Sequence, residues 1–96
     1  MQNNSNNEKL LADILKALAN EDRIKILKLI INSDKPLHIK ALTELLKTDY
    51  ANVYKNVKIL EKAGILGVFV VGRSRVPYVK KKEELAKLFD QIGKII

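Results

Sequence analysis

The stretch Lys47–Leu66, KTDYANVYKNVKILEKAGIL, decides the fold. Asp49 is placed to accept backbone N–H bonds at a helix N-terminus, and Gly64 supplies the positive φ at which helices commonly end. Between them, three apolar residues recur at helical spacing: Val53, Val57 and Leu60. They predict an inward helix face. A strand-like run follows Gly64 at once, so the segment predicts a helix that leads directly into a β-strand.

The opposite face of this helix is polar. Its central stripe follows helical spacing and consists of Ala51, Tyr54, Lys55 and Lys58. Two cations, a phenol and one small side chain replace an apolar seam there, so the stripe is typical of a binding surface. Tyr50 and Asn52 complete the candidate site on this helix.

Each of these residues also has a structural interpretation. Tyr54 is alternatively a rim aromatic that covers the core, and Lys55 and Lys58 are alternatively solvated charges. Asn52 and Asn56 lie off the central stripe, where either adenine contact or a capping role is open.

Three helices are predicted before this segment. The first follows the polar run Gln2–Asn7, with Ser5 and Glu8 spaced as a capping box, and extends to about Ala19. The second begins after the N-cap Asn20. Its predicted inward residues are Ile24, Leu27 and Ile31.

A break at residues 33–36 precedes a third, short helix over His38–Leu46. The three-residue turn Lys47–Asp49 then joins this helix to the next. Two short helices connected in this way are a helix-turn-helix unit, whose second helix enters the major groove of DNA.

The rest of the chain predicts a β-hairpin and a final helix. Leu66–Val71 has strand composition, residues 72–75 form a turn, and Val76–Val79 returns as a short or edge strand because Pro77 cannot donate a ladder hydrogen bond. Three residues at the tip suit a narrow minor groove or its phosphates: Arg73, Ser74 and Arg75. The last helix covers Glu83–Ile96 and carries an apolar face.

The predicted fold is therefore mainly α with a small β-hairpin, a winged helix-turn-helix of order α-α-α-α-β-β-α. Residues 1–7 are expected to form a flexible polar tail, and residues 8–96 a single domain, since 96 residues suffice for one modest core. The apolar faces of the first and last helices are wider than so short a chain is expected to bury alone, which predicts a homodimer. The alternative is that these two helices pack on each other within one subunit.

Charge and composition favour a binding function. The net charge is +7, and residues 34–82 carry 11 Lys and Arg against 4 Asp and Glu. Such a basic segment suits a polyanion with spaced phosphates. The absence of Cys, of a secretory signal and of an apolar run near the length of a membrane span predicts a cytoplasmic protein without membrane contact.

The chain resembles the ArsR-like winged helix-turn-helix repressors. The resemblance rests on ALANEDRIKILKLI (Ala17–Ile30) and ANVYKNVKILEKAGIL (Ala51–Leu66) and extends over roughly residues 10–80. It implies a homodimer joined through the terminal helices, with paired recognition helices in successive major grooves and wings at the flanking minor groove. The expected interface residues are Leu11, Ile14, Leu15, Leu85, Leu88, Phe89 and Ile92.

The chain departs from this family where many members sense metal. His38 and Lys40 stand at the positions of the family's Cys-x-Cys pair, and the last helix offers carboxylates without His. We therefore expect no metal sensing, no cofactor, and a surface or capping role for His38.

Catalysis is poorly supported, because one His, no Cys and no Gly-rich phosphate loop leave no nucleophile paired with a base. The predicted function is a sequence-specific double-stranded-DNA-binding transcriptional regulator, a homodimeric repressor. The alternatives are a protein-interaction module of a larger transcription complex and a non-specific architectural DNA-binding protein.

Overall fold

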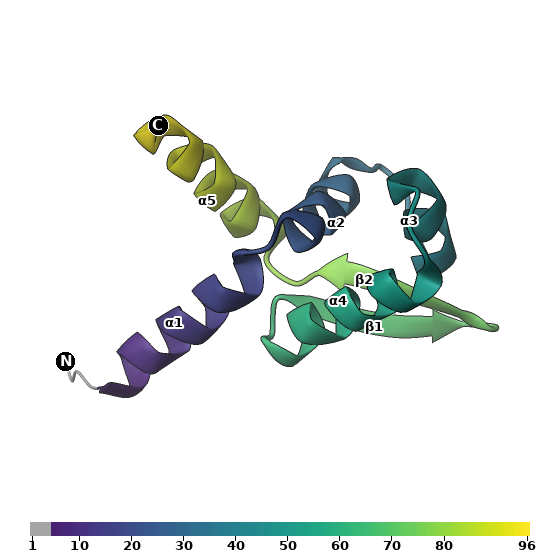
Figure 1. The fold of residues 1–96 in the computed structure, drawn as a ribbon, viewed down its shortest axis with the longest axis horizontal. Helices are drawn as coiled ribbons and strands as arrows, with labels where there is room; N and C mark the ends of the chain where they lie inside the picture. Colours follow the sequence, from purple (N-terminus) through teal and green to yellow (C-terminus); the bar gives the residue numbers. More distant parts are fainter. Residues whose placement is uncertain (1–4) are drawn as a thin grey trace.

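The computed structural model describes residues 5–96. Their elements follow the predicted order α-α-α-α-β-β-α (Figure 1). The elements are α1 (Ser5–Leu18), α2 (Glu21–Asn32), α3 (Ile39–Leu46), α4 (Tyr50–Lys62), β1 (Leu66–Val71), β2 (Ser74–Val79) and α5 (Lys82–Ile95).

The three central helices begin at side-chain caps. Asn20, His38 and Asp49 each accept a hydrogen bond from the backbone N–H three residues further on, at 3.1, 3.0 and 2.7 Å. Each bond satisfies one of the N–H groups that a helix N-terminus otherwise leaves without a partner. The capping roles predicted for Asp49 and His38 are thus confirmed, although α3 begins one residue after His38.

The hairpin turn is tighter than predicted. The two strands pair antiparallel from Leu66 opposite Val79 to Val71 opposite Ser74, which leaves Gly72 and Arg73 as a two-residue loop. Gly72 has φ +61°, as the first central residue of a type II′ turn requires. The predicted four-residue turn is therefore wrong, and the last two of its residues belong to β2.

The core lies between α2, α3, α4 and the hairpin. Its most deeply buried side chains are Ile26, Leu27, Ile39, Leu42, Val53, Val57, Leu60 and Leu66. All three inward residues predicted for α4 are among them. In α2, however, the buried face differs from the predicted one. Leu27 is buried as expected, but the second buried residue is Ile26, whereas Ile24 and Ile31 are only half-buried. The reason is that α2 packs against α1, α3, α4 and β2 together, so its covered face is set by four neighbours.

The elements α2, α3, α4 and the hairpin form the body of the molecule, and the terminal helices α1 and α5 extend from it as two arms. Figure 1 shows α1 and α5 diverging from the same end of the molecule, whose longest dimension is 44 Å. Among the described side chains of α1 only Ala17 and Leu18 are buried, and α5 buries only Leu85. Each arm is therefore anchored at the end that joins the body.

The N-terminal prediction is partly wrong. Helix α1 already includes residues 5–7, for which the sequence predicts a flexible tail. Glu8 lies in its first turn, where a carboxylate is favoured by the helix dipole. Residues 1–4 and the side chain of Ser5, hence the predicted capping box, lie outside what the structure describes.

Candidate nucleic-acid interface

The polar stripe of α4 faces outward as predicted. Ala51, Lys55 and Lys58 are exposed, whereas Tyr54 is half-buried and packs against the core. Tyr54 therefore belongs to the outer surface and also fulfils the alternative interpretation of a rim aromatic.

Aromatic and cationic side chains converge around Tyr54. Its ring stacks on that of Tyr50, with centroids 6.2 Å apart and planes inclined by 15°. The guanidinium carbon of Arg75 lies 5.5 Å from the Tyr54 centroid, and Lys58 Nζ lies 6.0 Å from it. Cations at such distances are attracted to the ring face. The cluster Tyr50, Tyr54, Lys58 and Arg75, here called the tyrosine cluster, joins α4, the predicted recognition helix, to the β1–β2 hairpin, which forms the wing.

The two lysines of the stripe differ in their electrostatic surroundings. Lys58 Nζ lies 3.4 Å from Glu61 Oε1, so part of its charge is balanced within the helix. The side chain of Lys55 has no ion pair or hydrogen bond with another residue in the described range 5–96. Lys55 is therefore the cation of α4 that is freer to bind an external acceptor.

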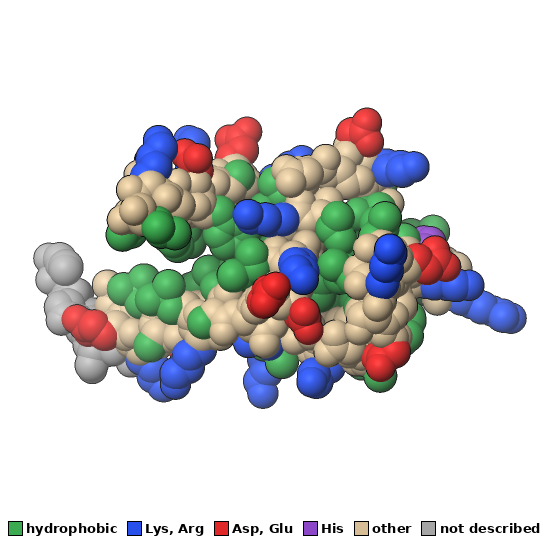
Figure 2. Space-filling view, turned by 45° about the horizontal axis from the view of Figure 1, so that its top comes forward, with side chains coloured by type: hydrophobic (Ala, Val, Ile, Leu, Met, Phe, Trp, Pro, Cys, Tyr) green, Lys and Arg blue, Asp and Glu red, His purple; other side chains and the backbone are tan. Residues whose placement is uncertain are grey.

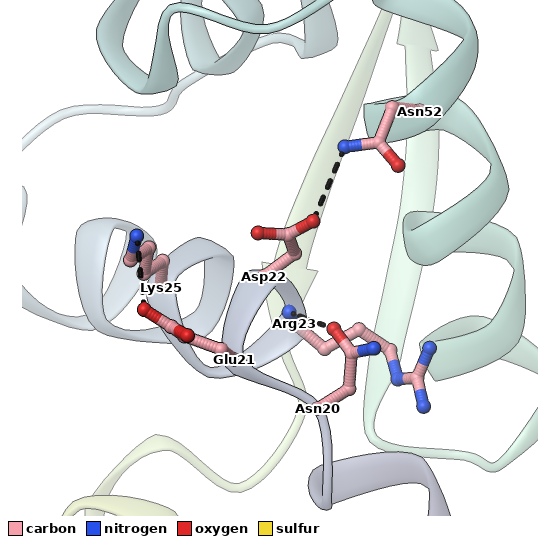
Figure 3. Close-up of polar contacts among 6 residues, drawn as sticks. All are labelled: Asn20, Glu21, Asp22, Arg23, Lys25 and Asn52. Carbon is pink, nitrogen blue, oxygen red and sulfur yellow. Dashed lines mark hydrogen bonds and ion pairs between the residues drawn. The ribbon is translucent and has the colours of Figure 1, made fainter.

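The two asparagines are held by intramolecular bonds. Asn52 Nδ2 donates to Asp22 Oδ2 at 3.4 Å (Figure 3) and to Thr48 Oγ1 at 3.2 Å. Asn56 is only 3% exposed and donates to the Asn52 carbonyl at 3.1 Å. Adenine contact is thereby excluded for Asn56, while Asn52 is half-buried at the edge of the surface.

The wing residues are spread over the turn and the second strand. Arg73 lies exposed in the turn, Ser74 is the half-buried first residue of β2, and Arg75 is exposed opposite Val70. Two valines beside them are also exposed, Val70 at 64% and Val71 at 58%. The sequence did not predict that these valines are exposed, because the composition of a strand does not reveal how far along its length it is covered by the core.

The arms carry most of the exposed apolar surface. Figure 2 shows hydrophobic side chains along the facing sides of α1 and α5, with an open cleft between the two helices. Two apolar grooves of about 280 and 380 Å³ flank α5. Of the predicted interface residues, five are exposed by 37–57%: Leu11, Ile14, Leu15, Leu88 and Ile92.

The other two predicted interface residues are less accessible. Leu85 is 8% exposed and belongs to the core of its own subunit, which leaves little of its side chain for a partner, and its place in the interface stays a prediction. Phe89 is half-buried against the same core and also lines the larger groove. The first turns of α5 are therefore an anchor, and its accessible face begins at Leu88.

Two further features of the described residues concern metal binding and membranes. Within residues 5–96, no three side chains of His, Cys, Asp or Glu are grouped in a way that could hold a metal ion. In the same range, no helix is both long and apolar enough to cross a membrane.

The element order, the capped helix pair and the hairpin define a winged helix-turn-helix protein. A family model described as HVO_A0114 matches residues 18–86, and the chain belongs to this family. No curated protein is similar enough in sequence to match the chain.

Several solved structures share the fold. One is the homodimeric winged helix-turn-helix DNA-binding domain (fragment 1-100) of Mb0332 from Mycobacterium bovis, a possible ArsR-family transcriptional regulator, with 21% identity over 99% of this chain and 89% of that chain and a TM-score of 0.79. HlyU from Vibrio cholerae is 19% identical over 93% of this chain and 97% of its own, with a TM-score of 0.79. NolR from Sinorhizobium fredii is 15% identical over 96% of both chains, with a TM-score of 0.76. The resemblance to ArsR-like proteins is thus confirmed at the level of the fold.

Proposed function

We propose that the chain is a sequence-specific double-stranded-DNA-binding transcriptional regulator of the cytoplasm, acting as a homodimeric repressor without metal sensing. The observation that carries this proposal is the tyrosine cluster. It holds the outward stripe of α4 and the Arg75 guanidinium of the wing on one surface, with Arg75 5.5 Å from the Tyr54 ring. A helix that reads base edges and a wing that contacts backbone or minor groove must present such a shared surface.

The residues of this surface have chemistry suited to DNA. Lys55 is exposed and free to donate to guanine acceptors, while Lys58 is partly balanced by Glu61 and better suited to a phosphate. Tyr50 and Tyr54 offer rings for thymine methyl groups and a phenol for phosphate. Arg73 and Arg75 extend the cationic surface along the wing, where each phosphate contact releases counterions.

The arms support the homodimer. Fifteen large hydrophobic side chains of residues 5–96 are exposed, and eight of them lie on α1, on α5 or at Ile96. Exposed apolar patches of this extent mark interaction sites in soluble proteins. The similar fragment of Mb0332 is described as homodimeric, and a two-fold dimer would present two recognition helices to a palindromic site.

One observation favours the alternative of a protein-interaction module. Four apolar side chains of the wing are exposed by 44–64%: Phe69, Val70, Val71 and Tyr78. A protein partner would use such residues as anchors, whereas DNA has little apolar surface for them. The first experiment is chosen to separate these two functions.

Purified protein is incubated with random-sequence double-stranded DNA across a salt series, bound fragments are sequenced, and the mass of the protein in solution is recorded. We expect a dimer that enriches a palindrome. Tight but unselective binding would identify an architectural protein instead. No binding at low salt would favour the protein-interaction module.

Variants assign the roles within this experiment. Lys55→Ala should weaken binding to the enriched site more than to random duplex, and Lys87→Ala on the outer face of α5 serves as control. Arg73→Ala combined with Arg75→Ala should make the salt dependence of binding shallower, by about one unit of slope for each lost phosphate contact. An unchanged slope would remove the wing from the DNA interface.

A further inference from the structure

Arg23 lies where arm α1 meets the body. Its side chain leaves the first turn of α2 and runs toward α4, beside the Asn20 cap (Figure 3). The guanidinium Nε donates to the Ala17 carbonyl at 2.6 Å and one terminal nitrogen donates to the Lys16 carbonyl at 3.3 Å. Both carbonyls belong to the last turn of α1, where a helix lacks internal donors and favours a cation.

The same guanidinium is bonded to the recognition helix. Its other terminal nitrogen donates to Asn56 Oδ1 at 3.0 Å. Asn56 Nδ2 in turn donates to the Asn52 carbonyl at 3.1 Å, and the Asn52 side chain reaches Thr48 and Asp22. A continuous chain of hydrogen bonds therefore leads from the end of α1 to the exposed first turn of α4.

We propose that Arg23 and Asn56 are positioning residues that fix the angle between α1 and the recognition helix, and thereby set the half-site spacing that the dimer accepts on DNA. This inference rests on the proposed function, in which α1 joins the subunits and α4 reads each half-site. In a two-fold dimer the path from the symmetry axis to α4 determines the distance between the two recognition helices, and half-site spacing follows from that distance.

Because α1 is long and weakly packed, a small change in its angle to α4 moves the far end of the helix by a large distance. Among the described side chains of α1, only those of Ala17 and Leu18 are buried, so few packing contacts resist a rotation of the helix. A helix of 14 residues is about 21 Å long at about 1.5 Å per residue. A rotation of about 10° at the anchored end would therefore move the far end by about 3.6 Å, close to the rise of about 3.4 Å between successive base pairs.

The side chains suit a link of fixed geometry. Arg23 holds acceptors on two helices at once through a planar group with its donors in fixed directions, which a flexible Lys ammonium cannot reproduce. Asn56 is nearly inaccessible to solvent, and it both accepts from Arg23 and donates to the backbone of α4. Its Oδ1 acceptor is the group that the link requires.

Two variants should break the link, and a third should preserve it. Asn56→Leu removes the acceptor, and Arg23→Lys removes the planar donor group while keeping the charge. Asn56→Asp keeps an acceptor for Arg23, loses the amide donor and adds a negative charge that the Arg23 guanidinium balances, so it is the matched control for the acceptor. Two breaking variants are used because one of them could fail to fold, and thermal unfolding checks that each variant is folded at the assay temperature.

The first readout is binding to palindromes whose half-sites are separated by the selected spacing or by one base pair more or less. The native protein should prefer one spacing. The preference should fall by about tenfold in both breaking variants, as expected for the loss of one ordinary interaction, and should persist in Asn56→Asp. A loss of fold stability alone would weaken binding to all spacings equally.

The second readout does not require DNA. The chain contains no Cys, so Lys9→Cys on α1 and Lys40→Cys on α3 provide unique sites for spin labels. Labelled protein diluted into unlabelled protein should give a narrow distance distribution that broadens in Asn56→Leu and Arg23→Lys.

The two readouts separate the possible failures. A distribution that stays narrow in both breaking variants would overturn the link itself. A broadened distribution with an unchanged spacing preference would overturn its role in DNA recognition. If the native protein selects no palindrome, the proposed function fails, and with it the role in spacing, while the distance measurement still decides whether the link holds the arm.

Discussion

The body and the arms of this molecule are built in different ways. In the body, α2, α3 and α4 each begin at a side-chain cap and bury an apolar face in a common core. The arm α5 has Lys81 at its N-cap position, where the side chain makes no capping bond, and it buries only Leu85. The body therefore has the interactions of an independently stable unit, whereas the arms have those of elements that need further contacts.

The contrast also separates two tasks. A rigid body is needed to hold the tyrosine cluster, because base reading depends on a fixed surface. Arms with exposed apolar faces are suited to association, since burial of those faces becomes possible only when a second surface arrives. Substitutions in the two regions should consequently differ in how their effects depend on protein concentration.

The largest effect is expected in the core of the body. Leu60 is fully buried, and Leu60→Ala should lower the free energy of unfolding by about 2–5 kcal/mol through lost burial and the cavity left behind. Urea denaturation at two protein concentrations measures this loss, which should be equal at both. Leu10→Ala on α1, where the side chain is 60% exposed, is the matched control. This variant should lower the free energy of unfolding only at concentrations where the dimer forms. A loss of similar size at both concentrations would contradict the proposed difference between body and arms.

The next largest effect is expected for dimerisation through the arms. Leu88→Glu combined with Ile92→Glu places charges on the exposed face of α5 and should weaken dimerisation by about 100-fold, or about 2.7 kcal/mol, because unpaired charges resist burial. Sedimentation velocity over a concentration series gives the dissociation constant. Lys87→Gln combined with Gln91→Glu lowers the charge equally on the opposite stripe and should leave the dimer intact. A double variant that stays dimeric would place the interface elsewhere.

The body was more predictable from sequence than the arms. Caps and helical spacing are local signals, and Asp49 with Val53, Val57 and Leu60 defines α4 correctly for that reason. The winged helix order follows once the hairpin composition is added. The outward stripe of α4 was predicted for the same local reason, since burial of one helix face leaves the other exposed.

The errors share a physical cause. Ile26 is buried by elements distant in sequence, and periodicity cannot tell which of several apolar residues on α2 those elements cover. From the sequence, adenine contact is open for Asn56, but its hydrogen-bond partner Arg23 stands 33 positions earlier in the chain. Polar links between distant segments leave no spacing signal, so the connection between arm and recognition helix appears only in the structure.

A smaller effect tests the capping of the body. Asp49→Ala should lower the free energy of unfolding by about 1 kcal/mol, because the N–H at the start of α4 loses its carboxylate acceptor at 2.7 Å. Asp49→Ser keeps a capping oxygen and should recover most of the stability. Thermal or urea unfolding of the two variants measures the difference. Equal losses in both would mean that the charge near the helix terminus matters more than the capping bond.

The smallest effect would make an arm more like the body. Lys81 precedes α5 without a capping bond, and Glu84 stands three residues later, so Lys81→Ser would create the spacing of a capping box. We expect a gain of about 0.5 kcal/mol in the free energy of unfolding and slower amide hydrogen exchange in the first turn of α5. Lys81→Ala removes the same charge without adding a cap and is the control. A gain shared by both variants would assign the effect to lost charge repulsion within the run Lys80–Lys82. The missing cap would then not limit the stability of α5, and only the lack of packing contacts would.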